Sequence, residues 1–348
     1  MNIINLFSKI NYFLKPVRKK QIILILFLTV CLSFAELFSL ASLIPFISAF
    51  INPEFFTSNP ITSNILIYFD IKNQESIFKF FTVIFIFFVI LSALIKLAHL
   101  KMSNKIAENI SSDFQTKIFE FYINQPLKYH FDNNSSKIFS SLAQKSKNFT
   151  ILIFSGITIL SSFLTSLFIV TFLIILEPFY TSLILFIFTT VFVIIFLFKS
   201  KKLLNKGKEI SLNQNLLFEI FQKSVGYISE IILYNLRKLF INNLSNSSYK
   251  IANTSAEIKI IGQTPRIYLE YFSIIALTVL IYFLGTENNN FESNLAFLAA
   301  LAFGAQKTLP LINQIYVHST LIKSSQIIVS EFIEILNNQN INIEEKIN

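Results

Sequence analysis

Six long apolar runs, separated by polar segments, set the pattern of the chain. A helix needs roughly 20 apolar residues to cross the ~30 Å hydrocarbon core of a bilayer, and each run is close to this length or longer. The pattern therefore predicts an all-α membrane protein with six transmembrane helices. The predicted spans cover about residues 21–50, 77–100, 149–176, 179–198, 266–284 and 294–315.

Polar helical patterns continue beyond several of these runs. After the second run, Ile106, Ile110, Phe114 and Ile118 keep a helical period, while charged and amide side chains fill the other faces. These patterns predict two long helical hairpins outside the membrane, each tipped by a short helix, the second of them capped by Ser224. The predicted divisions are an amphipathic basic segment at 1–20, a six-helix domain at 21–337 and a polar tail at 338–348.

The first run holds a carboxylate at membrane depth. Glu36 lies about 22 Å from the basic end of the run at a rise of 1.5 Å per residue. A bare carboxylate at this depth costs roughly 3 kcal/mol or more, so Glu36 is either protonated or faces a partner. Further along, Pro45 removes one backbone hydrogen bond, which predicts a bend near the far end of this helix.

Two amphipathic segments flank the first run. Before it, Ile3, Phe7 and Ile10 stand at helical spacing ahead of a basic cluster at 15–20, which predicts a helix at the membrane surface. A positive-inside anchor is favoured there over a specific lipid site. After the run, a second apolar stripe is too short to span and is predicted to lie flat on the outer face. Its members are Ile61, Ile65, Leu66 and Phe69.

Composition and charge agree with a membrane protein. The chain is 53% hydrophobic, has a mean hydropathy of +0.60 and carries a formal net charge of +9. Cations concentrate before the first run and after the second and fourth, whereas Lys72 is the one cation of the outer connections, so both termini are expected in the cytoplasm. This bias accounts for the net charge, and nucleic-acid binding is not expected. The single Cys31 excludes an intrachain disulfide, and His99, His130 and His318 have no spacing that indicates a metal.

Charged residues within or beside the spans are candidates for a substrate cavity. In addition to Glu36, they are Lys96, Arg266, Glu270 and Lys307. Counted from the outer end of its helix, Lys307 lies close to the depth of Glu36, so an ion pair between the two is geometrically possible. The alternatives are snorkelling of Lys96 and Arg266 to the interface, and an i,i+4 pair between Arg266 and Glu270. Snorkelling is favoured for Lys96.

Five strings add to the pattern of runs and hairpins. They are AELFSLASLIPF in the first run, QPLKYHFDNNSSKI and GYISEIILYNLR at the two tips, PRIYLEYF in the fifth run and KTLPLINQIY in the sixth. With these strings, six spans and two long hairpins, the chain resembles the transmembrane domain of exporter-type (type IV) ABC transporters. It is most similar to the subgroup of flippases that move lipid-linked oligosaccharides or related glycolipids.

This resemblance implies a multi-pass homodimer in the cytoplasmic membrane of a bacterium, with a membrane lipid as its substrate. In the resembling flippases, cations of the cavity bind the pyrophosphate of the lipid donor, and Lys96, Arg266 and Lys307 fall at matching positions. The flat helix after the first span is associated there with the lipid tail. Our stripe from Ile61 to Phe69 occupies the corresponding place.

The resemblance also implies that the two tips are coupling helices, which dock onto a nucleotide-binding domain. The candidate residues are Pro126, Leu127, Tyr129, His130 and Phe131 at the first tip, and Gly226, Tyr227, Glu230 and Arg237 at the second.

One motif of the resembling family is missing from this chain. Its six glycines never form the G-x-x-x-x-G-K-[ST] phosphate cradle, so no catalytic residue is expected here. ATP and Mg²⁺ are expected on a nucleotide-binding domain that is either cut from this chain or supplied by another. An ATP-independent channel or secondary transporter and a non-transporting scaffold are the alternatives, although a carrier would have no use for two long cytoplasmic projections.

Overall fold

The described part of the chain is almost entirely helical and contains no strand. The computed structural model describes residues 12–51, 73–132, 146–176, 178–287 and 291–347, together with Ser8, Ile10, Phe56 and Tyr68. Its helices are α2 (Pro16–Ala41), α3 (Leu43–Ile51), α6 (Gln74–Ile123), α7 (Leu127–Asp132), α9 (Ser146–Leu176), α10 (Pro178–Gly226), α11 (Ile228–Leu233), α12 (Arg237–Glu287) and α13 (Phe291–Ile347).

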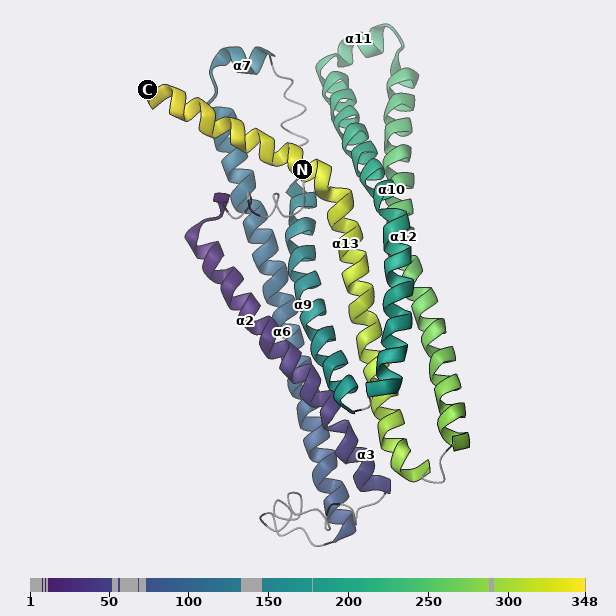
Figure 1. Ribbon diagram of the computed structural model, residues 1–348. Coiled ribbons are helices and arrows are strands. Elements are labelled where there is room, and N and C mark those ends of the chain that lie inside the picture. Colours follow the sequence, from purple (N-terminus) through teal and green to yellow (C-terminus); the bar gives the residue numbers. More distant parts are fainter. Residues whose placement is uncertain are drawn as a thin grey trace.

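Helix α13 lies at the centre of the arrangement (Figure 1). It packs along α9 on one side and against α10 and α12 on the other, whereas α2, α6 and α9 pack against one another. The short helices α7 and α11 lie at the same end of the molecule, which we call the tip end. Because α10 and α12 have 49 and 51 residues, each is about 75 Å long, far more than a bilayer core requires.

Three helical stretches of the described residues are long and apolar enough to cross a membrane. They are Pro16–Ile51, which takes α2 and α3 together, Gln74–Ile123 and Ser146–Leu176. These stretches contain the first three predicted spans. On their outer faces, Ile23, Phe27 and Phe87 are more than half exposed, and such an apolar surface is typical of helices that face lipid.

The first apolar run forms two helices that meet at Ser42. Helix α2 ends at Ala41 and α3 begins at Leu43. Pro45 has no N–H to donate to the carbonyl of Ala41, four residues earlier, so the regular hydrogen bonding is interrupted at this point. The bend predicted near Pro45 takes the form of this break.

Helix α12 continues through Pro265, and α13 extends over residues 338–347. One helix boundary predicted from the sequence was wrong. Ser224 does not cap the second tip helix, because it lies inside α10 and donates its hydroxyl to the carbonyl of Ile220. Extending an existing helix adds a hydrogen bond per residue without a new nucleation cost, so helices continue where the pattern weakens.

One buried core joins the start of the chain with α2, α6, α9 and α13. The predicted stripe of Ile106, Ile110, Phe114 and Ile118 lies in this core, and each of its side chains is at most 2% exposed. The ring of Phe149 packs on that of Phe114 with centroids 4.5 Å apart. The stripe therefore holds the polar continuation of α6 against its neighbours.

Ion pairs fix the start of α2 to the same part of α6. Asp113 Oδ1 lies 2.9 Å from Lys15 Nζ, and its Oδ2 lies 2.7 Å from Arg18 Nε. Burial raises the pKa of Asp113, but hydrogen bonds from Arg18 and Lys15 and their charges lower it further, so the net shift is downward. Since α2 begins at Pro16, the basic cluster at 15–20 lies mainly in the first turn of α2.

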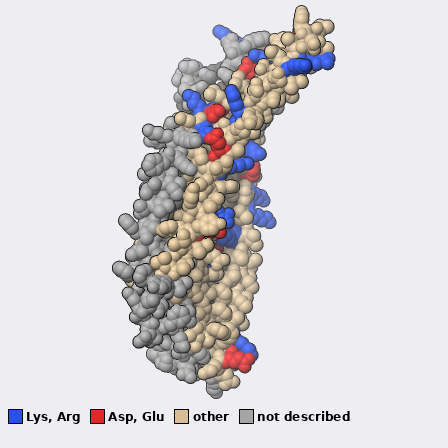
Figure 2. Space-filling view, turned by 90° about the vertical axis from the view of Figure 1, so that its right-hand side faces the viewer, with Lys and Arg blue, Asp and Glu red and all other residues tan. Residues whose placement is uncertain are grey.

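Charge is unevenly distributed along the molecule. On the face shown in Figure 2, charged side chains gather over the half that contains the tip end. The opposite half carries few of them, apart from a small group at its extremity. This distribution is the one expected if the weakly charged half lies in the hydrocarbon of a membrane.

Candidate functional site

A polar stripe runs along one face of α2. Its members, Thr29, Ser33, Glu36 and Ser39, recur every three or four residues and therefore share a face of the helix. All four are at most 6% exposed. The stripe turns inward, towards α6, α9 and α13, and leaves the apolar faces of α2 to the outside.

Glu36 joins three helices through two ion pairs. Lys307 Nζ of α13 lies 2.6 Å from Glu36 Oε2, and Lys96 Nζ of α6 lies 3.1 Å from Glu36 Oε1. Lys307 also donates to Ser39 Oγ and lies 5.2 Å from the ring centre of Phe303. The pair that the depths of Glu36 and Lys307 allowed is therefore present. We call Glu36, Ser39, Lys96 and Lys307 the Glu36 cluster; its two ammonium groups and one carboxylate give a net charge of +1.

The two lysines of the Glu36 cluster differ in burial. The side chains of Glu36 and Lys307 are 8% and 18% exposed, whereas that of Lys96 is 58% exposed. Exposed ion pairs contribute at most about 1 kcal/mol, while a buried charge that loses its partner costs several. Lys307 is therefore the main partner of Glu36. The ammonium of Lys96, for which snorkelling was favoured, instead contacts Glu36 with much of its side chain still exposed.

Arg266 is paired elsewhere. Its Nε lies 3.9 Å from Glu270 Oε2, one turn further along α12, and both side chains are more than half exposed. This is the i,i+4 pair that the sequence allowed. Of the three cations predicted to form one site, the structure brings Lys96 and Lys307 together on Glu36 and pairs Arg266 within its own helix.

Hydroxyl groups link α2 to α6 and to α9 on the N-terminal side of Glu36 along α2. Thr29 Oγ1 lies 3.1 Å from His99 Nε2 of α6, and Ser33 Oγ lies 3.1 Å from Thr165 Oγ1 of α9. Interhelical hydrogen bonds of this kind contribute about 1 kcal/mol each within a membrane. Sequence reasoning missed these hydroxyls, although their regular spacing on α2 was a readable signal.

Helices α9 and α13 are joined in the same way. Ser162 Oγ donates to Gln314 Oε1 at 2.8 Å, and His318 Nδ1 lies 3.0 Å from Ser155 Oγ. His318 also packs edge-on against the ring of Phe154. This histidine therefore takes part in helix packing, as does His99, which is 7% exposed.

The coupling-helix candidates lie at the two tips. Leu127, Tyr129, His130 and Phe131 belong to α7, directly after Pro126, and Leu127 is 71% exposed. The His130 ring packs edge-on against Tyr122 at the end of α6. These positions form a short transverse helix, as the sequence predicted.

The second tip is also a short helix, and only Tyr227 separates it from the preceding long helix. Gly226 is the last residue of α10, Tyr227 precedes α11, Glu230 lies in α11 and Arg237 begins α12. Asn235 adopts a φ of 54°, the left-handed conformation that asparagine tolerates in tight turns. A groove of about 730 Å³ lies between α11 and the adjoining ends of α10 and α12.

The lipid-tail candidates Ile61, Ile65, Leu66 and Phe69 lie outside the described residues. Among the residues that the structure describes, no group of three or more His, Cys, Asp or Glu side chains could hold a metal ion.

The long helices and polar interior define a membrane protein, and comparison with known families specifies its class. The sequence profile of the ABC transporter transmembrane region matches residues 21–303. The chain therefore belongs to the family of ABC transporter transmembrane domains, the permease part of the transporter, which is not itself catalytic. Domains of this family typically pair with a nucleotide-binding domain. A search of curated proteins gave no significant match.

Proposed function

We propose that this chain is the substrate-translocating half of an ATP-driven exporter that flips an anionic lipid or lipid-linked oligosaccharide across the bacterial cytoplasmic membrane. The observation that carries the proposal is the Glu36 cluster, a net cationic site among helices whose outer faces are apolar. Charges at membrane depth are retained where they serve a pathway, and a phosphate or pyrophosphate group is the anion that ammonium groups recognise in a lipid donor.

The different burial of the two lysines supports a binding order. Lys96, with 58% of its side chain exposed, makes the first contact with an arriving anion. Lys307, held by Glu36 and Ser39, supplies the second charge. A lysine provides a point charge on a flexible stem, so the site selects for negative charge more than for a fixed ligand geometry. Glu36 keeps both ammonium groups in place when the anion is absent.

Six spans and a homodimer complete the proposal. Helices α2 with α3, α6, α9, α10, α12 and α13 each supply one span, with the tip end and both termini in the cytoplasm. Two copies would enclose one path with twelve spans. The concentration of cations in the segments that lead to the tip end supports this orientation. The stripe from Ile61 to Phe69 would then contact the lipid tail at the outer face, and Arg266 and Glu270 would line the path further in.

The tips α7 and α11 would transmit the conformational change from a nucleotide-binding domain, carried either on a continuation of this chain or on another one. Apolar side chains at the second tip support such a contact, because Tyr227, Leu233 and Tyr234 are 60%, 80% and 73% exposed. ATP and Mg²⁺ would be bound by that partner domain. The test is to express this chain in its native cell and to ask whether a nucleotide-binding domain co-purifies with it. Co-purification would favour this proposal over a channel, a secondary transporter or a scaffold.

The test of the anion site is ATP turnover in the reconstituted complex. Replacing both lysines, Lys96→Gln with Lys307→Gln, should abolish the stimulation of turnover by an anionic lipid donor while basal turnover remains. Lys79→Gln is the control, because Lys79 pairs with Glu75 on the exposed start of α6, away from the Glu36 cluster. Unchanged stimulation in the double variant would exclude the proposed site.

A further inference from the structure

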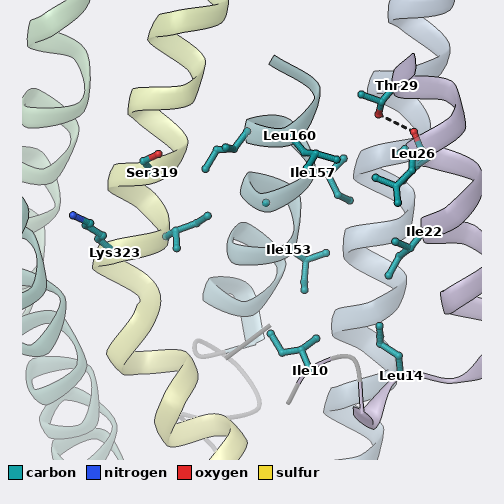
Figure 3. A pocket seen from close by; sticks show the side chains of 14 residues that line it. Ile10, Leu14, Ile22, Leu26, Thr29, Ile153, Ile157, Leu160, Ser319 and Lys323 are labelled. Atoms are coloured by element: carbon teal, nitrogen blue, oxygen red, sulfur yellow. Dashed lines mark hydrogen bonds between the residues drawn. The ribbon is translucent and has the colours of Figure 1, made fainter. Parts of the chain in front are cut away.

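A second feature of the interior is an apolar pocket between the start of the chain, α2, α9 and α13 (Figure 3). It has a volume of about 650 Å³. Ile10 and Leu14 lie at one end of it, and Thr29 and Leu160 lie towards the other. The function proposed above does not use this pocket.

The lining of the pocket suits a hydrocarbon chain. Isoleucine and leucine side chains make up most of its walls, and Thr29, Ser319 and Lys323 are the polar side chains among them. The hydroxyl of Thr29 is engaged, because it donates to the carbonyl of Ile25 and contacts His99. Walls of this kind offer water few hydrogen-bond partners and favour an apolar ligand.

The segment of α2 from Lys19 to the end of the pocket wall has about the length of one bilayer leaflet. Lys19, Ile22, Leu26 and Thr29 follow one another at intervals of three and four residues, so they share a face of α2. Ten residues from Lys19 to Thr29 correspond to about 15 Å, or half of the ~30 Å hydrocarbon core. The apolar wall on α2 therefore begins at Ile22, one turn after Lys19, and ends at Thr29, about 10 Å short of the depth of Glu36.

Charge at the end of the pocket formed by Ile10 and Leu14 favours an anionic headgroup. The start of α2 carries four cations, Lys15, Arg18, Lys19 and Lys20, and the carboxylate of Asp113 pairs with two of them. Asp113 binds Lys15 and Arg18, which lie on the side of α6. Lys19 is exposed and lies three residues before Ile22, so among the remaining cations of α2 it is the one on the face that lines the pocket, where Lys323 of α13 is a second cation.

We propose that this pocket holds an acyl chain of a resident anionic phospholipid of the cytoplasmic leaflet, with its phosphate at Lys19. The lipid would lie beside the transport path, and its acyl chain would end on the cytoplasmic side of the Glu36 cluster. The sequence alone favoured a simple anchor over a specific lipid site at this basic cluster. Because an apolar pocket adjoins Lys19 on α2, we now favour the lipid site. The proposal depends on the orientation given above but not on ATP turnover, so the two can fail separately.

The absence of tryptophan from the chain allows a direct test. Leu160→Trp places a single fluorophore on the pocket wall, where Leu160 is 42% exposed. Leu100→Trp is the control reporter, because Leu100 is 51% exposed on α6 and is not part of the lining. It also lies at a similar level to the pocket, since its neighbour His99 contacts Thr29. Each full-length variant is reconstituted in phosphatidylcholine vesicles that contain an equal fraction of either phosphatidylglycerol or phosphatidylcholine with brominated acyl chains, which quench tryptophan.

At Leu160→Trp, brominated phosphatidylglycerol should bind about fivefold more tightly than brominated phosphatidylcholine, which is the effect of one cation near an anionic headgroup. At Leu100→Trp the two lipids should quench almost equally. Adding Lys19→Gln should bring the ratio at the pocket close to one. Lys20→Gln removes the same charge one position away, on the face of α2 that carries Ile23 and Phe27, and should leave the ratio unchanged.

Three results would overturn the proposal. Equal quenching by both lipids at Leu160→Trp would show no headgroup selection. An equal effect of Lys19→Gln and Lys20→Gln would mean that overall charge, not a site, attracts the lipid. A lack of quenching by either lipid at Leu160→Trp, with normal quenching at Leu100→Trp, would show that protein fills the pocket, whether another segment of this chain or a second copy.

Discussion

At the residue scale, the sequence predicted how far along its helix a side chain lies. It did not predict which neighbouring helix that side chain faces. The fixed rise per residue placed Glu36 and Lys307 at similar depths on two different helices, and the structure joins them at 2.6 Å. The same reasoning did not place Lys96 on Glu36, because it does not say which face of α6 meets α2. Ser39 was missed for the same reason, since its contact with Lys307 depends on how α2 and α13 are rotated.

The first prediction concerns the unequal weight of the two lysines in the stability of the fold. Lys307→Met should lower the free energy of unfolding by about 3 kcal/mol, because Glu36 then stays buried without its main partner. Lys96→Met should cost no more than about 1 kcal/mol, since the exposed pair that it removes is weak. Thermal unfolding of the detergent-solubilised chain measures both values.

A rescue experiment serves as the control for this prediction. Adding Glu36→Gln to Lys307→Met removes the uncompensated carboxylate, so most of the lost stability should return. If Lys96→Met destabilises the chain as much as Lys307→Met does, or if Glu36→Gln fails to rescue, Lys307 is not the main partner of Glu36.

At the scale of helices, the apolar periodicity was the most informative signal. It identified the stripe from Ile106 to Ile118 on the polar part of α6, and those side chains are buried. The ends of helices were less accessible from the sequence. Helix α12 continues through Pro265, although a proline removes one hydrogen bond of the helix. Ser224 matched the chemistry of a helix cap but lies four residues before the start of α11 at Ile228, whose flanking residue is Tyr227.

The second prediction concerns the close approach of α10 to α13 at Gly207. A Cβ atom on Gly207 would lie 2.9 Å from the carbonyl carbon of Ser324 and closer still to its oxygen. Because that neighbour is backbone, one helix must shift, and Gly207→Ala should cost about 1–3 kcal/mol of unfolding free energy. Thermal unfolding of the variant in detergent gives this cost.

Gly226→Ala is the matched control for Gly207→Ala. A Cβ atom on Gly226 would meet nothing within 4 Å, and no described glycine has a positive φ. Alanine is also the better helix former, so Gly226→Ala should be neutral or stabilise by up to about 1 kcal/mol. Equal melting temperatures for the two variants would contradict the packing that we describe between α10 and α13.

At the scale of the whole molecule, the sequence indicated which segments are helices and which parts carry charge, but not the order of packing. Six apolar runs and two polar hairpins are visible in one dimension, and the match to the ABC transporter transmembrane region agrees with them. No local sequence pattern predicts that α13 lies between α9 and the α10–α12 pair. It depends on close contacts between distant segments, such as Gly304 of α13 against Leu173 of α9.

The third prediction concerns the orientation of the molecule in the membrane, which both proposals require. In a Cys31→Ser background, Glu75→Cys and Tyr227→Cys each introduce one thiol at a well-exposed position, at opposite ends of the molecule. Because cations concentrate towards the tip end, Tyr227 should face the cytoplasm and Glu75 the outside. A membrane-impermeant thiol reagent should therefore label Glu75→Cys in intact cells, and Tyr227→Cys only after the membrane is opened. Labelling of Tyr227→Cys in intact cells would place the tips outside, where no ATP-driven partner could reach them and where Lys19 could not meet a lipid of the cytoplasmic leaflet.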